Sequence, residues 1–253
     1  MRSDRFLELT LTICTFCVTI ARSYDLNEED VMSMKDSLSQ SRFSRYLASA
    51  GGDEARAIEL YQWNTLTAQS LYVYLQCWEI AFRNKADSFL RWKFRSNAWP
   101  YDARRAVRSL ARDESRRLQE TINRQEQKRK LSPVSTDAIV ADLSAGFWVA
   151  LLSTSYEVPY AWRYNLKRIF PNDNQLDRKT AHGMSERILN LRNRIAHHEP
   201  IYGLALYQTY AELQRLVAAM CADTDAFARS NCTFLAVLAR QPAFLNYPSS
   251  TPK

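Results

Sequence analysis

Glycine and proline are scarce in this chain, with five glycines and eight prolines among 253 residues. Average usage is well above this, so turn-dense sandwiches and barrels are disfavoured, as is a glycine-rich loop that cradles a phosphate. Histidine is scarcer still: there are three, and two of them are adjacent, at His197 and His198. This pair is therefore the first place to look for chemistry.

The five cysteines are too few and too scattered to form a disulfide framework, which needs paired residues. Cys14 and Cys17 form a CxxC pair, but no second pair or nearby histidine completes a zinc site. We expect free thiols in a reducing cytoplasm, no metal and no cofactor.

The apolar stretch at 9–21 is the longest near the N-terminus, and it is too short to span a bilayer. It loosely resembles a secretory signal, but Glu8 and several threonines and cysteines weaken its apolar region, and Ala21 precedes an arginine rather than a good cleavage site. We expect no membrane segment and a cytoplasmic protein. The predicted organisation is an N-terminal extension (1–27), one all-α domain (28–241) and a tail (242–253).

Helices are predicted throughout the domain. Residues 55–94 hold no glycine or proline, and their apolar positions recur at steps of three and four, which predicts one long helix. Gly51 and Gly52 break the chain before it, and Asp53 is the expected cap. The other helices are expected at 28–38, 42–50, 101–130, 135–152, 159–170, about 177–199, 204–222 and 224–239. The predicted fold class is all-α.

Residues 101–130 hold most of the net charge of +7, with ten Lys or Arg against five Asp or Glu. A thin apolar stripe predicts one exposed helix. Contacts from it to RNA would be to phosphates, with salt-dependent affinity and little sequence choice, although a solvated face explains the charge equally well. The expected RNA-binding residues of this stretch are Arg104, Arg105, Arg108, Arg112 and Arg116.

The end of the helix at 177–199 gathers Arg, Asn, His and Glu side chains within two turns. Asn193 and His197 are about 40° apart on one face, and the long side chain of Arg192 can reach the same end. Histidine is a proton carrier near neutral pH, and a guanidinium binds phosphate oxygens as a fork. The side-chain amide of Asn193 can orient either the histidine or the arginine.

These groups suffice for metal-free cleavage of RNA. A neutral histidine takes the proton of a ribose 2′-hydroxyl, the freed oxygen attacks the adjacent phosphate, and arginine stabilises the added charge while a histidine protonates the leaving oxygen. DNA lacks the 2′-hydroxyl. The alternative is a non-catalytic helical module that binds RNA or protein, in which Arg192 and His197 only grip phosphate or cap a helix. The isolated His182 is predicted to be non-catalytic.

The segment from Arg192 to His197 resembles the RNxxxH form of the R-x4–6-H motif of HEPN ribonucleases. Its context resembles the Abi-like (AbiD/AbiF, abortive-infection) family of that superfamily, over roughly residues 32–225. The other stretches that carry the resemblance are 60–64, 78–84, 143–153 with its Gly-Phe-Trp segment, and 197–201.

The resemblance implies a HEPN-type four-helix bundle with additional N-terminal helices. It also implies a homodimer in which two motif helices form one composite RNA-cleaving site without a metal. The implied role is phage defence by abortive infection, or a toxin paired with a protein or small-RNA antitoxin. By position, Arg192 stabilises the phosphate, His197 is the acid and base, and Asn193 orients them. The supporting residues are His198 and Glu199, and Arg194 is a further expected RNA contact.

Three other features favour structural roles. Glu79 and Arg83, four residues apart on the long helix, are predicted to form a buried ion pair. Gly146 is expected to allow close helix packing, with Phe147 and Trp148 in the core. The remaining aromatic residues of interest, expected in the core or at a dimer contact, are Tyr160, Trp162 and Tyr164.

Overall fold

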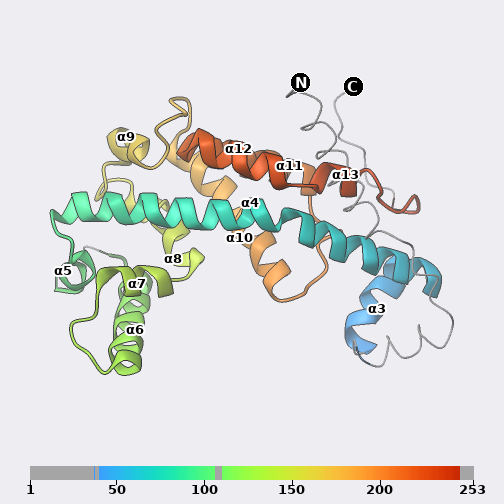
Figure 1. The fold of residues 1–253 in the computed structure, drawn as a ribbon, viewed down its shortest axis with the longest axis horizontal. Helices are drawn as coiled ribbons and strands as arrows, with labels where there is room; N and C mark the ends of the chain where they lie inside the picture. Colours follow the sequence, from blue (N-terminus) through green and yellow to red (C-terminus); the bar gives the residue numbers. More distant parts are fainter. Residues whose placement is uncertain (1–36, 38–39, 106–109, 246–253) are drawn as a thin grey trace, which may run out of the picture. The chain divides into compact units, whose positions relative to one another are not determined.

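The computed structural model describes residues 37, 40–105 and 110–245, with the side chains of 104 and 105 left out. Every regular element in these ranges is helical (Figure 1), so the all-α class is confirmed for this part of the chain. The CxxC pair, the N-terminal extension and Arg108 lie outside the described residues. The HEPN-type bundle and the single domain at 28–241 stay predictions.

The chain divides into two compact units, residues 1–60 and 61–253. In the first unit, α3 (Gln40–Ser49) is followed by Gly51 and Gly52, whose φ angles of 67° and 87° are left-handed and end the helix. Asp53 Oδ1 then accepts a hydrogen bond of 3.1 Å from the backbone N–H of Arg56. The predicted break and cap are both confirmed.

The long helix α4 (Glu54–Phe94) begins at this cap and continues into the second unit without interruption, as predicted. The elements that follow it are α5 (Trp99–Arg105), α6 (Arg112–Arg129), α7 (Thr136–Asp142), α8 (Ala145–Ala150), η1 (Thr154–Tyr156), α9 (Trp162–Asn165), η2 (Leu166–Arg168), α10 (Arg178–Ala196), α11 (Leu206–Met220), α12 (Ala222–Asn231) and α13 (Phe234–Leu238).

Within the second unit, side chains of α4 bind helices that are distant in sequence. The hydroxyl of Tyr74 donates to Asp225 Oδ1 of α12 at 2.8 Å. The guanidinium of Arg91 donates to Asp137 Oδ1 of α7 at 2.7 Å. Helix α4 is thereby fixed on both sides, which is consistent with its central course in Figure 1.

An aromatic cluster fills the core where α4 meets residues 154–168. The rings of Phe89 and Trp162 lie 4.6 Å apart between centroids, and Tyr160 packs on both. The predicted helix at 159–170 is wrong, because Ala161 is left-handed and the segment forms only the short helices α9 and η2. The irregular turn at Ala161 still leaves both Tyr160 and Trp162 buried. Tyr164 is 67% exposed rather than in the core.

The predicted helix at 135–152 is two helices, α7 and α8, separated by the extended Leu143 and Ser144. The break lets Leu143, Phe147 and Trp148 all be buried, which confirms the core placement of the aromatic pair. The role given to Gly146 is wrong, because a Cβ there would meet nothing closer than 3.8 Å.

Two more expected helices are divided. The stretch 101–130 forms α5 and α6, because the chain turns to bury Leu110 and the N–H of Ala111 donates to the Tyr156 hydroxyl at 2.9 Å. The stretch 224–239 separates into α12 and α13 at the extended Cys232, and Phe234 is fully buried after the break. Helix α6 also buries Leu118 and Ile122, so it is exposed on one side only.

The motif helix α10 is confirmed with bounds close to those predicted. It packs against α8 and α11, and its buried face carries Ile188 and Leu191. Asp177 caps its start, with Oδ1 accepting a 2.7 Å hydrogen bond from the N–H of Thr180. None of the described helices has both the length and the apolar character needed to cross a membrane.

Replacing Asp177 with alanine should destabilise the protein by about 1 kcal/mol near neutral pH, because the backbone N–H of Thr180, in the first turn of α10, loses its acceptor. The hydrogen bond from Thr180 holds the pKa of the Asp177 carboxyl below its ordinary value. Because the pKa of this carboxyl is lower in the folded than in the unfolded protein, its charge stabilises the folded protein at pH values above the unfolded pKa. This stabilisation is lost as the pH falls through the folded pKa. Urea unfolding of both proteins should therefore give a smaller difference near pH 3 than near pH 7. A difference independent of pH would contradict the charged cap.

Candidate functional site

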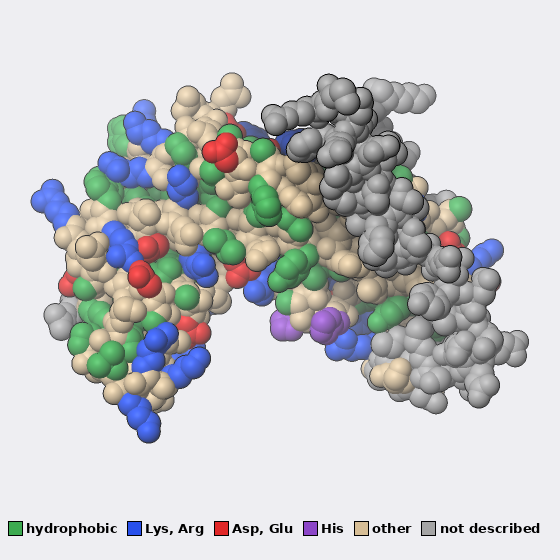
Figure 2. All heavy atoms as spheres, viewed as in Figure 1, with side chains coloured by type: hydrophobic (Ala, Val, Ile, Leu, Met, Phe, Trp, Pro, Cys, Tyr) green, Lys and Arg blue, Asp and Glu red, His purple; other side chains and the backbone are tan. Residues whose placement is uncertain are grey.

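Helix α10 ends in a Schellman motif. The N–H of Glu199 donates to the carbonyl of Arg194 at 2.8 Å, and the N–H of His198 donates to that of Ile195 at 3.1 Å. His198 is left-handed, with a φ of 56°. This turn leaves both His197 and His198 exposed at the helix end, and histidine side chains stand on the surface beside an indentation in Figure 2.

Arg194 and Glu199 form an ion pair across the same turn, with 3.3 Å between Nε and Oε2. A pair this exposed is worth at most about 1 kcal/mol. It places Glu199 at the helix end, and the supporting role of Glu199 stays a prediction. Arg194, expected to contact RNA, has a carboxylate as its nearest charge.

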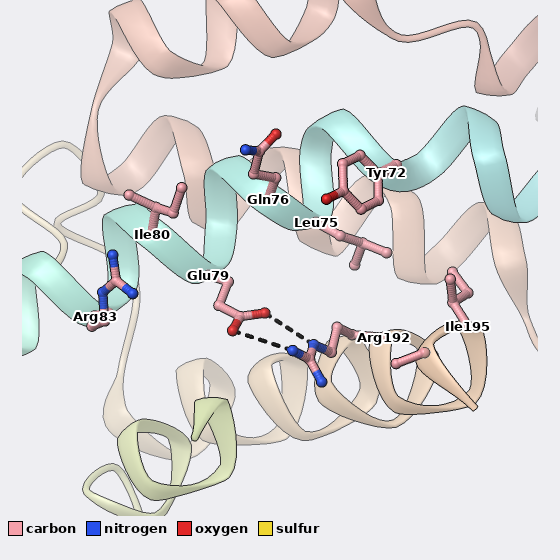
Figure 3. A pocket seen from close by; sticks show the side chains of 9 residues that line it. Tyr72, Leu75, Gln76, Glu79, Ile80, Arg83, Arg192 and Ile195 are labelled. Carbon is pink, nitrogen blue, oxygen red and sulfur yellow. Dashed lines mark hydrogen bonds and ion pairs between the residues drawn. The ribbon is translucent and has the colours of Figure 1, made fainter. Parts of the chain in front are cut away.

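Arg192 is held from α4. Its Nε donates to Glu79 Oε2 at 2.9 Å, and its Nη2 lies 3.4 Å from Glu79 Oε1. Its Nη1 faces Asn193 Oδ1 at 3.4 Å. Figure 3 shows the fork. Two of the three guanidinium nitrogens thus face a carboxylate. The third, Nη1, carries two N–H groups, so one of them is left to meet a ligand beside the contact with Asn193.

The predicted ion pair of Glu79 with Arg83 is wrong, because Glu79 turns to α10 instead. In Figure 3 the side chain of Arg83 lies apart from Glu79, which points to Arg192. Its Nε is buried with no hydrogen-bond partner in the described part of the chain. The Glu79–Arg192 pair joins residues 113 apart in sequence, and no local pattern reveals it.

Two hollows adjoin this pair, and Glu79 and Arg192 line both. The smaller, about 320 Å³, lies between α4 and the end of α10. The larger, about 760 Å³, lies among α6, α8 and α10. Asn193 lines only the larger, and His197 lines neither.

The arginines of α6 divide between the larger hollow and solvent. Arg112 lines the hollow, whereas Arg116 does not and pairs with Glu120 at 3.0 Å. Arg117, which the charge pattern did not single out, lies over α8 in the same hollow, 3.8 Å from where a Cβ on Gly146 would stand. Of the other predicted contacts, Arg104 and Arg105 fall in the last turn of α5.

His182 also lines the larger hollow, with Nε2 3.7 Å from Glu186 Oε1. Burial lowers the pKa of His182 below its ordinary value; the charge of Glu186 opposes this shift, and that of Arg178 adds to it. Ten residues of helix separate His182 from Arg192, about 15 Å along the axis. The two side chains line the same hollow from positions about three turns apart on α10, and the non-catalytic role of His182 stays a prediction.

Metal-ligating residues do not cluster in the described ranges: no three His, Cys, Asp or Glu side chains there are grouped to hold an ion. Cys77, Cys221 and Cys232 carry free thiols.

Comparisons with models of protein families, with curated proteins and with solved structures gave no match to this chain. The resemblance to the Abi-like family accordingly stays a prediction based on its motif residues. The chemistry open to the site depends on Arg192, its partners and the exposed helix end.

Proposed function

We propose that this protein is a metal-independent endoribonuclease of the Abi-like HEPN type. One observation carries the proposal. Glu79 of α4 and the adjacent Asn193 fix the guanidinium of Arg192 on α10. The end of the same helix α10 presents the exposed His197. A fixed cation and a free imidazole within two helical turns are the two groups that cleavage by the 2′-hydroxyl requires.

Arg192 binds the scissile phosphate in this proposal. Glu79 occupies Nε and Nη2 and so sets the plane of the guanidinium, leaving Nη1 for a phosphate oxygen. A donor fixed before the reaction stabilises the charge that develops on the phosphorane without reorganising during the step.

His197 transfers the proton. As the neutral imidazole it accepts the proton of the 2′-hydroxyl while O2′ bonds to phosphorus, and the bond from phosphorus to O5′ breaks. The leaving O5′ takes a proton from a second, protonated histidine. The products are a 2′,3′-cyclic phosphate and a 5′-hydroxyl. In the homodimer that we propose, a second copy of the chain supplies that histidine from its own motif helix.

The biological setting that we propose follows from the resemblance alone. The RNA substrate would be cleaved in the cytoplasm during abortive infection or by a toxin released from a protein or small-RNA antitoxin. The exposed position of both histidines at the helix end is consistent with a site that a partner must complete or cover.

A specific observation favours the alternative, a helical module that binds RNA or protein without cleaving it. Two nitrogens of Arg192 already donate to Glu79, so the guanidinium could serve mainly to join α10 to α4. Such a module would hold RNA without turnover at any pH.

The deciding experiment offers the purified protein a structured RNA in EDTA and follows cleavage on a sequencing gel. We expect cuts that leave 2′,3′-cyclic phosphates. A matched RNA with a single 2′-deoxy nucleotide at a mapped site should lose that cut, because the attacking oxygen is missing, and should still be bound. Binding without any cut would establish the alternative, and cutting at the deoxy position would contradict the mechanism.

A further inference from the structure

The smaller hollow has walls suited to a flat, partly apolar ligand. Leu75, Ile80 and Ile195 contribute aliphatic surface, and Tyr72 stands at its edge (Figure 3). Tyr72 is 62% exposed and Ile80 is 40% exposed. An aromatic side chain and an aliphatic one are thus left in water beside a concave surface, where a stacking ligand would cover them.

Polar groups in the same hollow select for an anion with hydrogen-bonding edges. Its charged side chains are two guanidiniums, of Arg83 and Arg192, against the carboxylate of Glu79. The buried Nε of Arg83 has no hydrogen-bond partner among the described residues, and an unused buried donor costs free energy. The amide of Gln76, which is exposed, adds a donor and an acceptor.

The larger hollow is less suited to an anion. Its arginines are outnumbered by acidic side chains, so its lining is not cationic when His182 is neutral. The charged residues that line it are Glu79, Asp113, Glu114, Glu186, Arg112, Arg117 and Arg192. The smaller hollow therefore meets the requirement for a nucleotide better, because it combines stacking surface with net positive charge.

We propose that the smaller hollow binds one nucleobase of single-stranded RNA, from a nucleotide next to the phosphate that Arg192 holds. This inference rests on the proposed ribonuclease function and names its substrate as unpaired RNA. Bases splayed from a single strand are recognised by stacking on aromatic side chains and by hydrogen bonds to their edges. Tyr72 stacks on the base, and Gln76, one turn further along α4, bonds its edge. Arg83 lies about 16 Å along the helix from Tyr72, so its guanidinium faces the adjoining sugar-phosphate backbone rather than the base. A hollow of about 320 Å³ takes one nucleotide rather than a duplex.

The test measures binding of fluorescent single-stranded RNA whose 2′-hydroxyls are methylated, so that it cannot be cut. By fluorescence anisotropy, Tyr72→Ala should weaken binding by about 5- to 100-fold, because one stacking contact is lost. Tyr72→Phe keeps the ring and should bind within about twofold of the wild type. Tyr164→Ala is the matched control: Tyr164 is as exposed but lines neither hollow, and its loss should change binding less than about twofold.

The outcomes separate this inference from the ribonuclease proposal. If unmodified RNA is cut but Tyr72→Ala binds and cuts as Tyr164→Ala does, the subsite is wrong and the ribonuclease stands. If RNA is bound with the expected dependence on Tyr72 but never cut, the subsite stands and the ribonuclease is wrong. Analytical ultracentrifugation of the wild type and Tyr72→Ala adds a third outcome. If the wild type is a dimer and the variant a monomer, the hollow binds a second copy of the chain, and the proposed subsite is wrong.

Discussion

Replacing His197 with alanine should slow RNA cleavage by about 10²- to 10⁴-fold, the contribution typical of a positioned acid or base. The side chain is exposed at the C-cap of α10, so the free energy of unfolding should change by less than about 0.5 kcal/mol. Single-turnover cleavage in EDTA measures the first effect, and urea unfolding measures the second. A loss of activity without a loss of stability is what distinguishes a proton carrier from a structural residue.

His198 provides the matched control on the next residue. Because His198 is left-handed in the Schellman motif, His198→Gly removes a side chain from a conformation that costs L-residues about 1–2 kcal/mol. The variant should be at least as stable as the wild type, and because His198 has only a supporting role in this proposal, cleavage should slow far less than in His197→Ala. If it instead lost as much activity as His197→Ala, the assignment of the proton carrier to His197 would be wrong.

Arg192→Ala should lower kcat/KM for RNA cleavage by about 10²- to 10³-fold, the usual loss when one fixed donor to a developing oxyanion is removed. Arg192→Lys should recover little of this. A lysine is a point charge and cannot face Glu79 through two nitrogens while offering a third to phosphate. Steady-state kinetics on a short RNA measures both variants.

Arg187→Lys is the control for Arg192→Lys. Arg187 lies on the same helix and binds Glu212 through two contacts of 2.8 Å, but it lines neither hollow. It should cleave like the wild type even if it is somewhat less stable. If Arg192→Ala raised KM and left kcat unchanged, Arg192 would only grip the substrate, as the non-catalytic alternative requires.

The long helices could be predicted because each has a local signature. Helix α4 follows from apolar spacing uninterrupted by glycine or proline, and α10 from the cap at Asp177 and the stop before Pro200. The breaks at Leu143, Ala161 and Cys232 have no such signature. They exist because residues on both sides must enter one core, and that requirement is set by packing between distant segments.

The candidate site, too, could be predicted from the sequence only where local spacing determines it. The sequence places Arg192, Asn193 and His197 on two turns of one helix, because helical spacing alone decides which residues are neighbours. It misses Glu79, since the partner of Arg192 lies on α4, 113 residues away, and local spacing favours a pair of Glu79 with the arginine four residues along. It misses Arg117, because a charge pattern does not show which arginines of α6 line the larger hollow.

The Glu79–Arg192 pair has a consequence for how ligands in the two hollows affect one another. The pair lines both, so a ligand that draws the guanidinium toward one hollow changes the charge and shape of the other. Ligand binding in the two hollows is then thermodynamically linked. Each ligand changes the affinity of the protein for the other by the same factor. A ligand in the larger hollow that contacts Arg192 would therefore change RNA affinity in the smaller one through a single side chain.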